Sequence, residues 1–86
     1  AKVLLDDDTG KVELTDQNGT KIEMTSSKLL IEGASDIEIK AAGNIKIEGV
    51  NVDANASGAA TVKGSGSATL EASGQTTVKG SVVMIN

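Results

Sequence analysis

The 86-residue sequence contains no Phe, Tyr or Trp and no Cys, His or Pro. Globular cores draw much of their buried area from aromatic rings, whereas the largest apolar side chains here are Leu, Ile and Met. A single chain of this length with so little apolar bulk has difficulty offsetting the entropy lost on folding. β-branched residues nevertheless alternate regularly with polar ones, unlike in disordered tracts. We therefore expect one domain whose burial comes from other copies of the chain.

The missing residue types exclude several functions. Without Cys the chain has no disulfide and no thiol ligand for a metal. Catalysis needs a nucleophile–base pair or paired carboxylates in a pocket, yet His and Cys are absent and the acidic residues alternate with the apolar ones. A net charge of −4 disfavours nucleic-acid binding, which requires a basic surface. We expect no enzyme activity, no cofactor and no metal.

No segment has the pattern of a membrane-targeting element. There is no apolar run long enough to span a bilayer and no signal-peptide pattern. Because the chain begins abruptly at Ala1, we expect it to be a segment of a larger protein.

Residues 1–26 are predicted to form short antiparallel strands that lead into a different region. Three apolar pairs alternate with polar residues: Val3/Leu5, Val12/Leu14 and Ile22/Met24. They are separated by "DDDTG" and "DQNG", and Asn18-Gly19 favours a hairpin because both residues tolerate positive φ. The carboxylates of Asp6, Asp7 and Asp8 are candidate calcium ligands. Their spacing lacks the calcium-loop pattern, however, and Asp is common in turns, which favours a turn.

Residues 27–86 repeat with a period of eight. The predicted core positions are Leu29, Ile31, Ile37, Ile39, Ile45, Ile47, Val52, Val62, Leu70 and Val78. A small residue follows each apolar pair, at Gly33, Ala41, Gly49, Ala56, Gly64, Ala72 and Gly80. Such a column marks corners with no room for a side chain or with unusual backbone angles. One repeat near Gly49-Val50 has seven residues instead of eight.

This octad predicts a β-helix made by several chains. Period two places the apolar columns on one face and polar residues such as Glu38 and Lys40 on the other. A β-helix of one chain needs about three strands, or roughly twenty residues, per turn, whereas an octad supplies one strand and one corner. Three chains wound together solve this geometry, and their narrow interior suits Ile, Val and Leu. We expect an all-β, intertwined homotrimeric β-helix (a β-prism).

Two further stretches invite a functional interpretation. The Gly-rich "KGSGSATLEASG" lacks the Gly-Lys-Ser/Thr ending of a phosphate-binding loop, and its glycines follow the octad, which favours corners. The final "SVVMIN" is apolar without alternation. It either closes the last core layer or forms an apolar apex that needs a cap, and we favour cap binding. The predicted cap-binding residues are Val82, Val83, Met84, Ile85 and Asn86.

The octads resemble the C-terminal spike of the VgrG family and its phage relatives, the central spikes of contractile tails and type VI secretion systems. The similar stretches are "NGTKIEMTSSKLLIEGASDIEIKAAGNIKIEG" and "ATVKGSGSATLEASGQTTVKGSVVMIN", with Val62-Lys63-Gly64 and Val78-Lys79-Gly80 as hallmark elements. The resemblance covers nearly the whole chain, less specifically up to about residue 20. It implies an intertwined homotrimeric needle that punctures a membrane and carries a PAAR-repeat tip protein.

The same resemblance implies a setting for the chain. The needle would join a tail hub or baseplate through its N-terminal side and touch a target membrane transiently. It would be part of a virion tail or secreted injection particle, and cytoplasmic before firing. Some phage spikes carry a metal-bound tip with a His-x-His element, which this chain lacks. We therefore expect no iron at the apex and a separate cap protein instead.

Three other interpretations compete. A trimeric β-helical fibre or adhesin shaft is the main alternative, although its tip would be expected to carry polar or aromatic receptor contacts. An amyloid-like repeat would grow without end, whereas the N-terminal hairpin and the abnormal last repeat favour a closed assembly. A monomeric β-solenoid is disfavoured by the eight-residue period.

Overall fold

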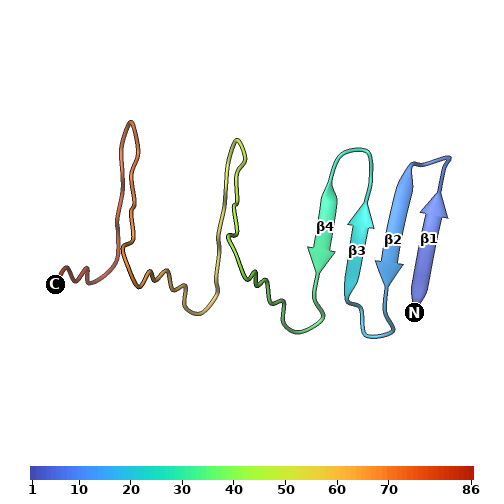
Figure 1. Cartoon of the computed structure of the whole chain (residues 1–86), viewed down its shortest axis with the longest axis horizontal. Helices are drawn as coiled ribbons and strands as arrows, with labels where there is room; N and C mark the ends of the chain where they lie inside the picture. The colour runs from blue at the N-terminus through green and yellow to red at the C-terminus, as the bar shows by residue number, and fades with distance from the viewer. The chain divides into compact units, whose positions relative to one another are not determined.

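The computed structural model describes all 86 residues, and its regular secondary structure is entirely β. Four strands form one antiparallel sheet in the order β1-β2-β3-β4 (Figure 1). Their bounds are β1 Lys2–Asp6, β2 Lys11–Thr15, β3 Lys21–Met24 and β4 Leu29–Glu32. The structure contains no helix that could cross a bilayer. The all-β prediction is confirmed.

The chain divides into two units, Ala1–Ile47 and Glu48–Asn86. The first unit contains the sheet and a following stretch of chain without regular strands. The second unit contains no regular strand and consists of extended segments separated by bends.

The turn between β1 and β2 is built by the first of the three clustered aspartates. Asp6 Oδ1 accepts hydrogen bonds from the backbone N–H groups of Asp8 at 3.0 Å and Thr9 at 3.3 Å. The hydrogen bond from Thr9 is the main reason that the pKa of Asp6 is lowered. Gly10 completes the turn with a φ of 69°, which residues with a side chain rarely adopt. This carboxylate therefore serves the turn.

The turn between β2 and β3 uses a second aspartate in the same way. Asp16 Oδ1 accepts hydrogen bonds from the N–H groups of Asn18 at 3.0 Å and Thr20 at 2.9 Å. Gly19 has a φ of 98°, whereas Asn18 does not adopt positive φ. The hairpin expected at Asn18-Gly19 is present, but its loop is longer than a two-residue turn and needs only one residue in the left-handed region.

The sheet continues past residue 26 through a third turn. Thr25 N–H donates to the carbonyl oxygen of Lys28 at 2.9 Å, and Thr25 Oγ1 accepts from the N–H of Lys28 at 3.3 Å. β4 then pairs with β3, with Ile31 opposite Ile22 and Leu29 opposite Met24. Leu29 and Ile31, predicted as the first octad pair, therefore lie in the antiparallel sheet. An octad strand and an antiparallel strand share the same period-two pattern, so the sequence does not distinguish them.

The register gives the sheet two different faces. Facing residues across the four strands form two apolar rows, Val3-Leu14-Ile22-Ile31 and Leu5-Val12-Met24-Leu29. The opposite face carries Lys, Glu and Thr, together with Leu4 and Leu30. No apolar side chain anywhere in the chain is buried. The single chain therefore has no hydrophobic core of its own.

Candidate functional site

The apolar face of the sheet, defined by its two apolar rows, is open. Val3 is 69% exposed, and even the central Leu14 and Ile22 are 47% and 44% exposed. An antiparallel sheet normally packs one face against a core and turns the other to water. Here the face with the composition of a core is the one without a covering layer.

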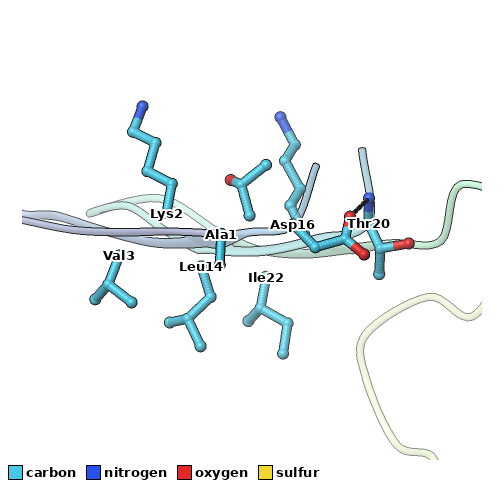
Figure 2. A pocket seen from close by; sticks show the side chains of 9 residues that line it. Ala1, Lys2, Val3, Leu14, Asp16, Thr20 and Ile22 are labelled. Carbon is cyan, nitrogen blue, oxygen red and sulfur yellow. Dashed lines mark hydrogen bonds between the residues drawn. The ribbon is translucent and has the colours of Figure 1, made fainter. Parts of the chain in front are cut away.

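Side chains at one end of this face border a shallow hollow of about 280 Å³. Figure 2 shows Val3, Leu14 and Ile22 projecting from the same side of the sheet, whereas Lys2 projects from the other. Asp16 and Thr20 lie at the margin, joined by the turn hydrogen bond. The centre of the hollow is thus formed by aliphatic side chains from three adjacent strands, which suits contact with another apolar surface.

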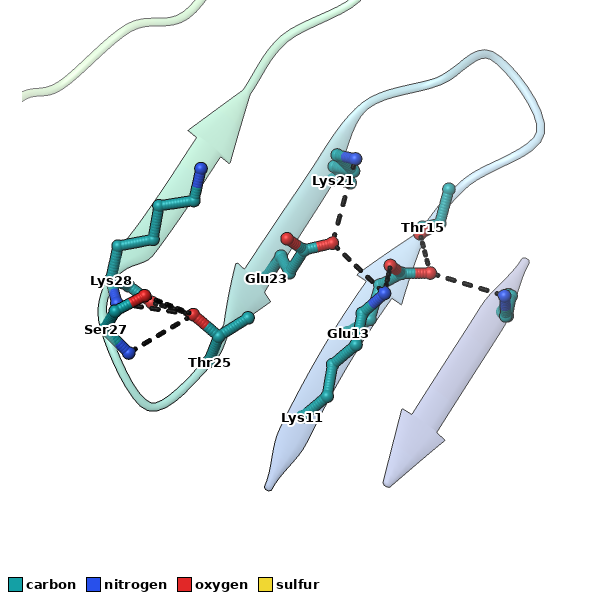
Figure 3. A network of polar contacts seen from close by, with 9 residues as sticks. Lys11, Glu13, Thr15, Lys21, Glu23, Thr25, Ser27 and Lys28 are labelled. Atoms are coloured by element: carbon teal, nitrogen blue, oxygen red, sulfur yellow. Dashed lines mark hydrogen bonds and ion pairs between the residues drawn. The ribbon is translucent and has the colours of Figure 1, made fainter. Parts of the chain in front are cut away.

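The polar face is organised around Glu13 in β2 (Figure 3). Its carboxylate lies 3.4 Å from Lys2 Nζ and 3.2 Å from Lys11 Nζ, and it accepts a hydrogen bond from Thr15 Oγ1 at 3.1 Å. Lys11 also lies 3.5 Å from the carboxylate of Glu23. Glu13 is only 8% exposed and is the one buried residue of the chain. The surrounding lysines and Thr15 therefore enclose the carboxylate of Glu13 on the polar face of the sheet.

The network shifts the titration of its members. The hydrogen bond from Lys11 is the largest cause that lowers the pKa of Glu13 from 4.5 to about 2. The same hydrogen bond is the main cause that raises the pKa of Lys11. Opposite charges in contact favour both charged forms. The polar face is thus satisfied within one chain, and the apolar face remains for a partner.

The sequence did not lead us to this network. The sequence nevertheless contains a signal for it. Polar residues alternate with apolar ones in both strands, at Lys11, Glu13 and Thr15 in β2 and at Lys21 and Glu23 in β3, so they lie on one face of the sheet. The hairpin register that brings the two strands together was needed to recognise it.

The predicted octad core residues after β4 are also open. Their exposed fractions are Ile37 52%, Ile39 72%, Ile45 51%, Ile47 77%, Val52 61%, Val62 94%, Leu70 77% and Val78 64%. In the first unit no backbone hydrogen bond lies beyond Ala34, whose N–H donates to Thr20 Oγ1 at 3.1 Å, and the second unit has none of its own. Extended chain with free N–H and C=O groups is a template for pairing with other strands.

The predicted corner column coincides with the bends of the backbone. In the first unit the chain bends at residues 34–35 and 42–43, directly after Gly33 and Ala41. In the second unit it bends at residues 50, 57–58, 65–66, 73–74 and 81–82. Each of these bends follows a member of the column, namely Gly49, Ala56, Gly64, Ala72 and Gly80. The bends therefore keep the period of the sequence, including its one seven-residue step.

The glycines of this column are crowded by the backbone itself. A Cβ at Gly33 would lie 2.8 Å from the carbonyl oxygen of Asp36, and one at Gly49 would lie 3.2 Å from that of Asn51. A Cβ at Gly64 would collide with the carbonyl oxygen of Ser67. By contrast, a Cβ at the glycines within the bends, at Gly43, Gly58, Gly66 and Gly74, would meet nothing within 4 Å. The two glycine columns thus have different physical roles.

The apolar run Val82–Ile85 and the adjoining Asn86 form the remaining candidate surface. Val82 is 78% exposed, Met84 90% and Ile85 90%, while Val83 is 48% exposed. The run makes no backbone hydrogen bond within its unit. Four consecutive exposed apolar residues provide a surface suited to an apolar partner.

No protein-family model matches this chain, and no curated protein matches it in sequence. The resemblance to contractile-tail spikes therefore depends on the octads themselves.

Proposed function

We propose that three copies of this chain intertwine into the β-helical shaft of a membrane-puncturing spike, part of a contractile injection machine of the phage-tail or type VI kind. The observation that carries the proposal is the accessible surface of the single chain, 8615 Å². A folded monomer of 8.6 kDa exposes ~4,700 Å². The excess of about 3,900 Å² per chain is several times the ~800 Å² that each partner buries in an ordinary interface.

The nature of the excess surface favours identical copies as partners. The exposed apolar residues recur on the octad period, and the backbone of the second unit has unused donors and acceptors along its whole length. A strand from another copy has the same period, so it can cover the exposed apolar residues and also pair with the free backbone groups. The hydrogen bonds between strands and the apolar contacts then recur at the same eight-residue interval. Three copies give the smallest closed prism in which each octad supplies one side and one corner.

Such a shaft suits a mechanical role. In an intertwined helix every backbone ladder joins different chains, so no chain peels away without breaking its pairing with the others. Six octads follow the sheet, and with ~4.8 Å per strand layer they give a shaft of ~29 Å, comparable to the ~30 Å hydrocarbon thickness of a bilayer. Contraction of a sheath would drive this shaft through a membrane.

The ends of the shaft would make the remaining contacts. The exposed run Val82–Ile85, with Asn86, would bind a PAAR-repeat tip protein that carries cargo, and the N-terminal side would join the tail hub or baseplate. The open apolar face of the sheet would pack against the same face of the other two copies. The role proposed for the chain is mechanical and uses no catalytic residue.

The test is the solution mass measured by multi-angle light scattering, with and without a PAAR-repeat protein. Because the chain has no Trp or Tyr, concentration must be followed by refractive index. A mass three times 8.6 kDa, rising by one cap per trimer, supports shaft and cap together. A trimer that binds no cap leaves the shaft but favours a fibre. A monomer at micromolar concentration overturns the proposal.

A further inference from the structure

The charged residues of the octads follow an order of their own. We number each octad from its first core residue, so that Leu29, Ile37 and Ile45 are first positions. The fourth-position column is Glu32, Lys40, Glu48, Asn55, Lys63, Glu71 and Lys79. The second-position column is Leu30, Glu38, Lys46, Asp53, Thr61, Thr69 and Thr77. Wherever consecutive octads both carry a charge in one of these columns, the two charges have opposite signs.

These charges are almost unused within the chain. Lys40 Nζ lies 3.4 Å from the carboxylate of Glu38 two residues earlier, with side chains 84% and 77% exposed. No other ion pair involves a residue after Glu23. The alternation therefore has no explanation in the contacts of a single chain.

Different pairings of octads give opposite electrostatic results. If copies stacked in register, each charge would face itself, as Lys40 against Lys40, and like charges directly opposite destabilise a sheet. If a single chain coiled with three octads per turn, Lys40 would face Lys63 and Glu48 would face Glu71. If neighbouring copies were offset by one octad, each of the six charged steps in the two columns would join a base to an acid.

We propose that these two charged columns select the register in which copies of this chain pair, which is a stagger of one octad. Lys40 of one copy then lies between Glu32 and Glu48 of its two neighbours, and Glu71 lies between Lys63 and Lys79. The inference rests on the proposed trimer, for which it specifies the register. An intertwined threefold β-helix requires this stagger. On each side of the prism, the strand stacked above a given octad comes from another copy, and it is the octad one place later in the sequence.

Asn55 has a defined place in this arrangement. The sign order of the fourth-position column reverses after the seven-residue step, so that Glu48 is followed by a neutral residue and then by Lys63. Asn55 divides the fourth-position column into two charge ladders, one formed by Glu32, Lys40 and Glu48 and the other by Lys63, Glu71 and Lys79. Because Asn55 is neutral, the signs in the second charge ladder do not depend on those in the first. The second-position column likewise changes from charges to threonines after Asp53, and facing threonines pair favourably across strands.

The columns contribute mainly to register. Exposed ion pairs add little affinity individually, whereas repeated like-charge contacts penalise pairing in register and pairing with offsets of two or three octads. An octad sequence needs such a penalty, because a shift by one whole octad leaves the apolar columns in place.

The first test uses disulfide trapping between copies. Facing positions on adjacent strands lie within the Cα separation that a disulfide accepts, ~4.4–6.8 Å. With Lys63→Cys and Glu71→Cys in the same chain, a one-octad stagger joins position 63 of each copy to position 71 of the next. Oxidation should then give a covalent trimer on a non-reducing gel, with 63–71 bridges by mass spectrometry. Glu71→Cys alone should remain a single chain, because no second cysteine faces it.

The outcomes separate the register from the assembly. Dimers formed by Glu71→Cys alone, or no bridge in the double variant while the native mass is that of a trimer, would overturn the stagger and the intertwining of the three chains, and would leave only a trimer packed in another way. A monomeric native mass would overturn the proposed function first.

A charge-reversal series provides the second test. Glu71→Lys places three lysines in succession in each ladder and should lower the unfolding temperature of the trimer by about 5 °C. Combining it with Lys63→Glu and Lys79→Glu restores the alternation with inverted signs, and the neutral Asn55 prevents a new conflict with Glu48. The triple variant should therefore regain most of the loss. If it is less stable than the single variant, the selection of the register by these charges is refuted.

Discussion

Exchanging Val62 and its neighbour for residues of the same shape provides a sharp test of burial between copies. In Val62→Thr the side chain keeps its volume and β-branching but gains a hydroxyl. Val62 is 94% exposed in the single chain, so the chain alone predicts almost no change. In the proposed trimer the hydroxyl enters the apolar interior, at ~1 kcal/mol or more per copy by protein mutational data. Three copies then lose about 3 kcal/mol, which corresponds to a roughly 100-fold weaker trimer.

The matched control is Thr61→Val, which makes the reverse exchange on the outward column one residue away. It should change the trimer dissociation constant by less than about threefold, since exposed substitutions have small effects. Sedimentation equilibrium gives the dissociation constants, and far-ultraviolet circular dichroism during denaturation gives the stabilities. Equal effects of Val62→Thr and Thr61→Val would show that the two columns do not occupy different environments, and the assignment of an inner face would be wrong.

Two further predictions concern the sheet and the bends. Because the pKa of Glu13 falls from 4.5 to about 2 on folding, its contribution to stability is complete above about pH 4.5 and is lost as the pH falls toward 2. Glu13→Gln should flatten that part of the stability profile in acid titrations followed by circular dichroism; an unchanged profile would contradict the role of the network. Gly64→Ala should destabilise the assembly by ~1–3 kcal/mol, because its Cβ would collide with the carbonyl oxygen of Ser67. Gly66→Ala, which meets nothing within 4 Å, should have little effect in the same denaturation experiment, and equal losses would count against the crowded corner.

Much of the local structure was accessible from the sequence because it depends on short-range rules. Alternating apolar residues identified the strands, and the Asp-rich and Asn-Gly segments identified two turns. The backbone bends directly after each member of the small-residue column, which keeps a strict period in the sequence. These features require only a few neighbouring residues.

Features that depend on pairing were not accessible in the same way. The end of the sheet at Glu32 was missed because Leu29 and Ile31 fit an antiparallel strand and an octad equally well. The enclosure of Glu13 depends on three strands coming together in one register.

The antiparallel sheet has a consequence for the order in which such an assembly would form. Each of its strands pairs with the next strand along the chain, so it closes through short loops and can fold quickly. The octads have no such local partner, and in the proposed trimer they would pair only with other chains. In the proposed trimer, three sheets meeting through their apolar faces would fix the alignment at one end, where the sequence does not repeat. Winding would then proceed from that end, and the rate of assembly would depend on protein concentration only until the sheets had met.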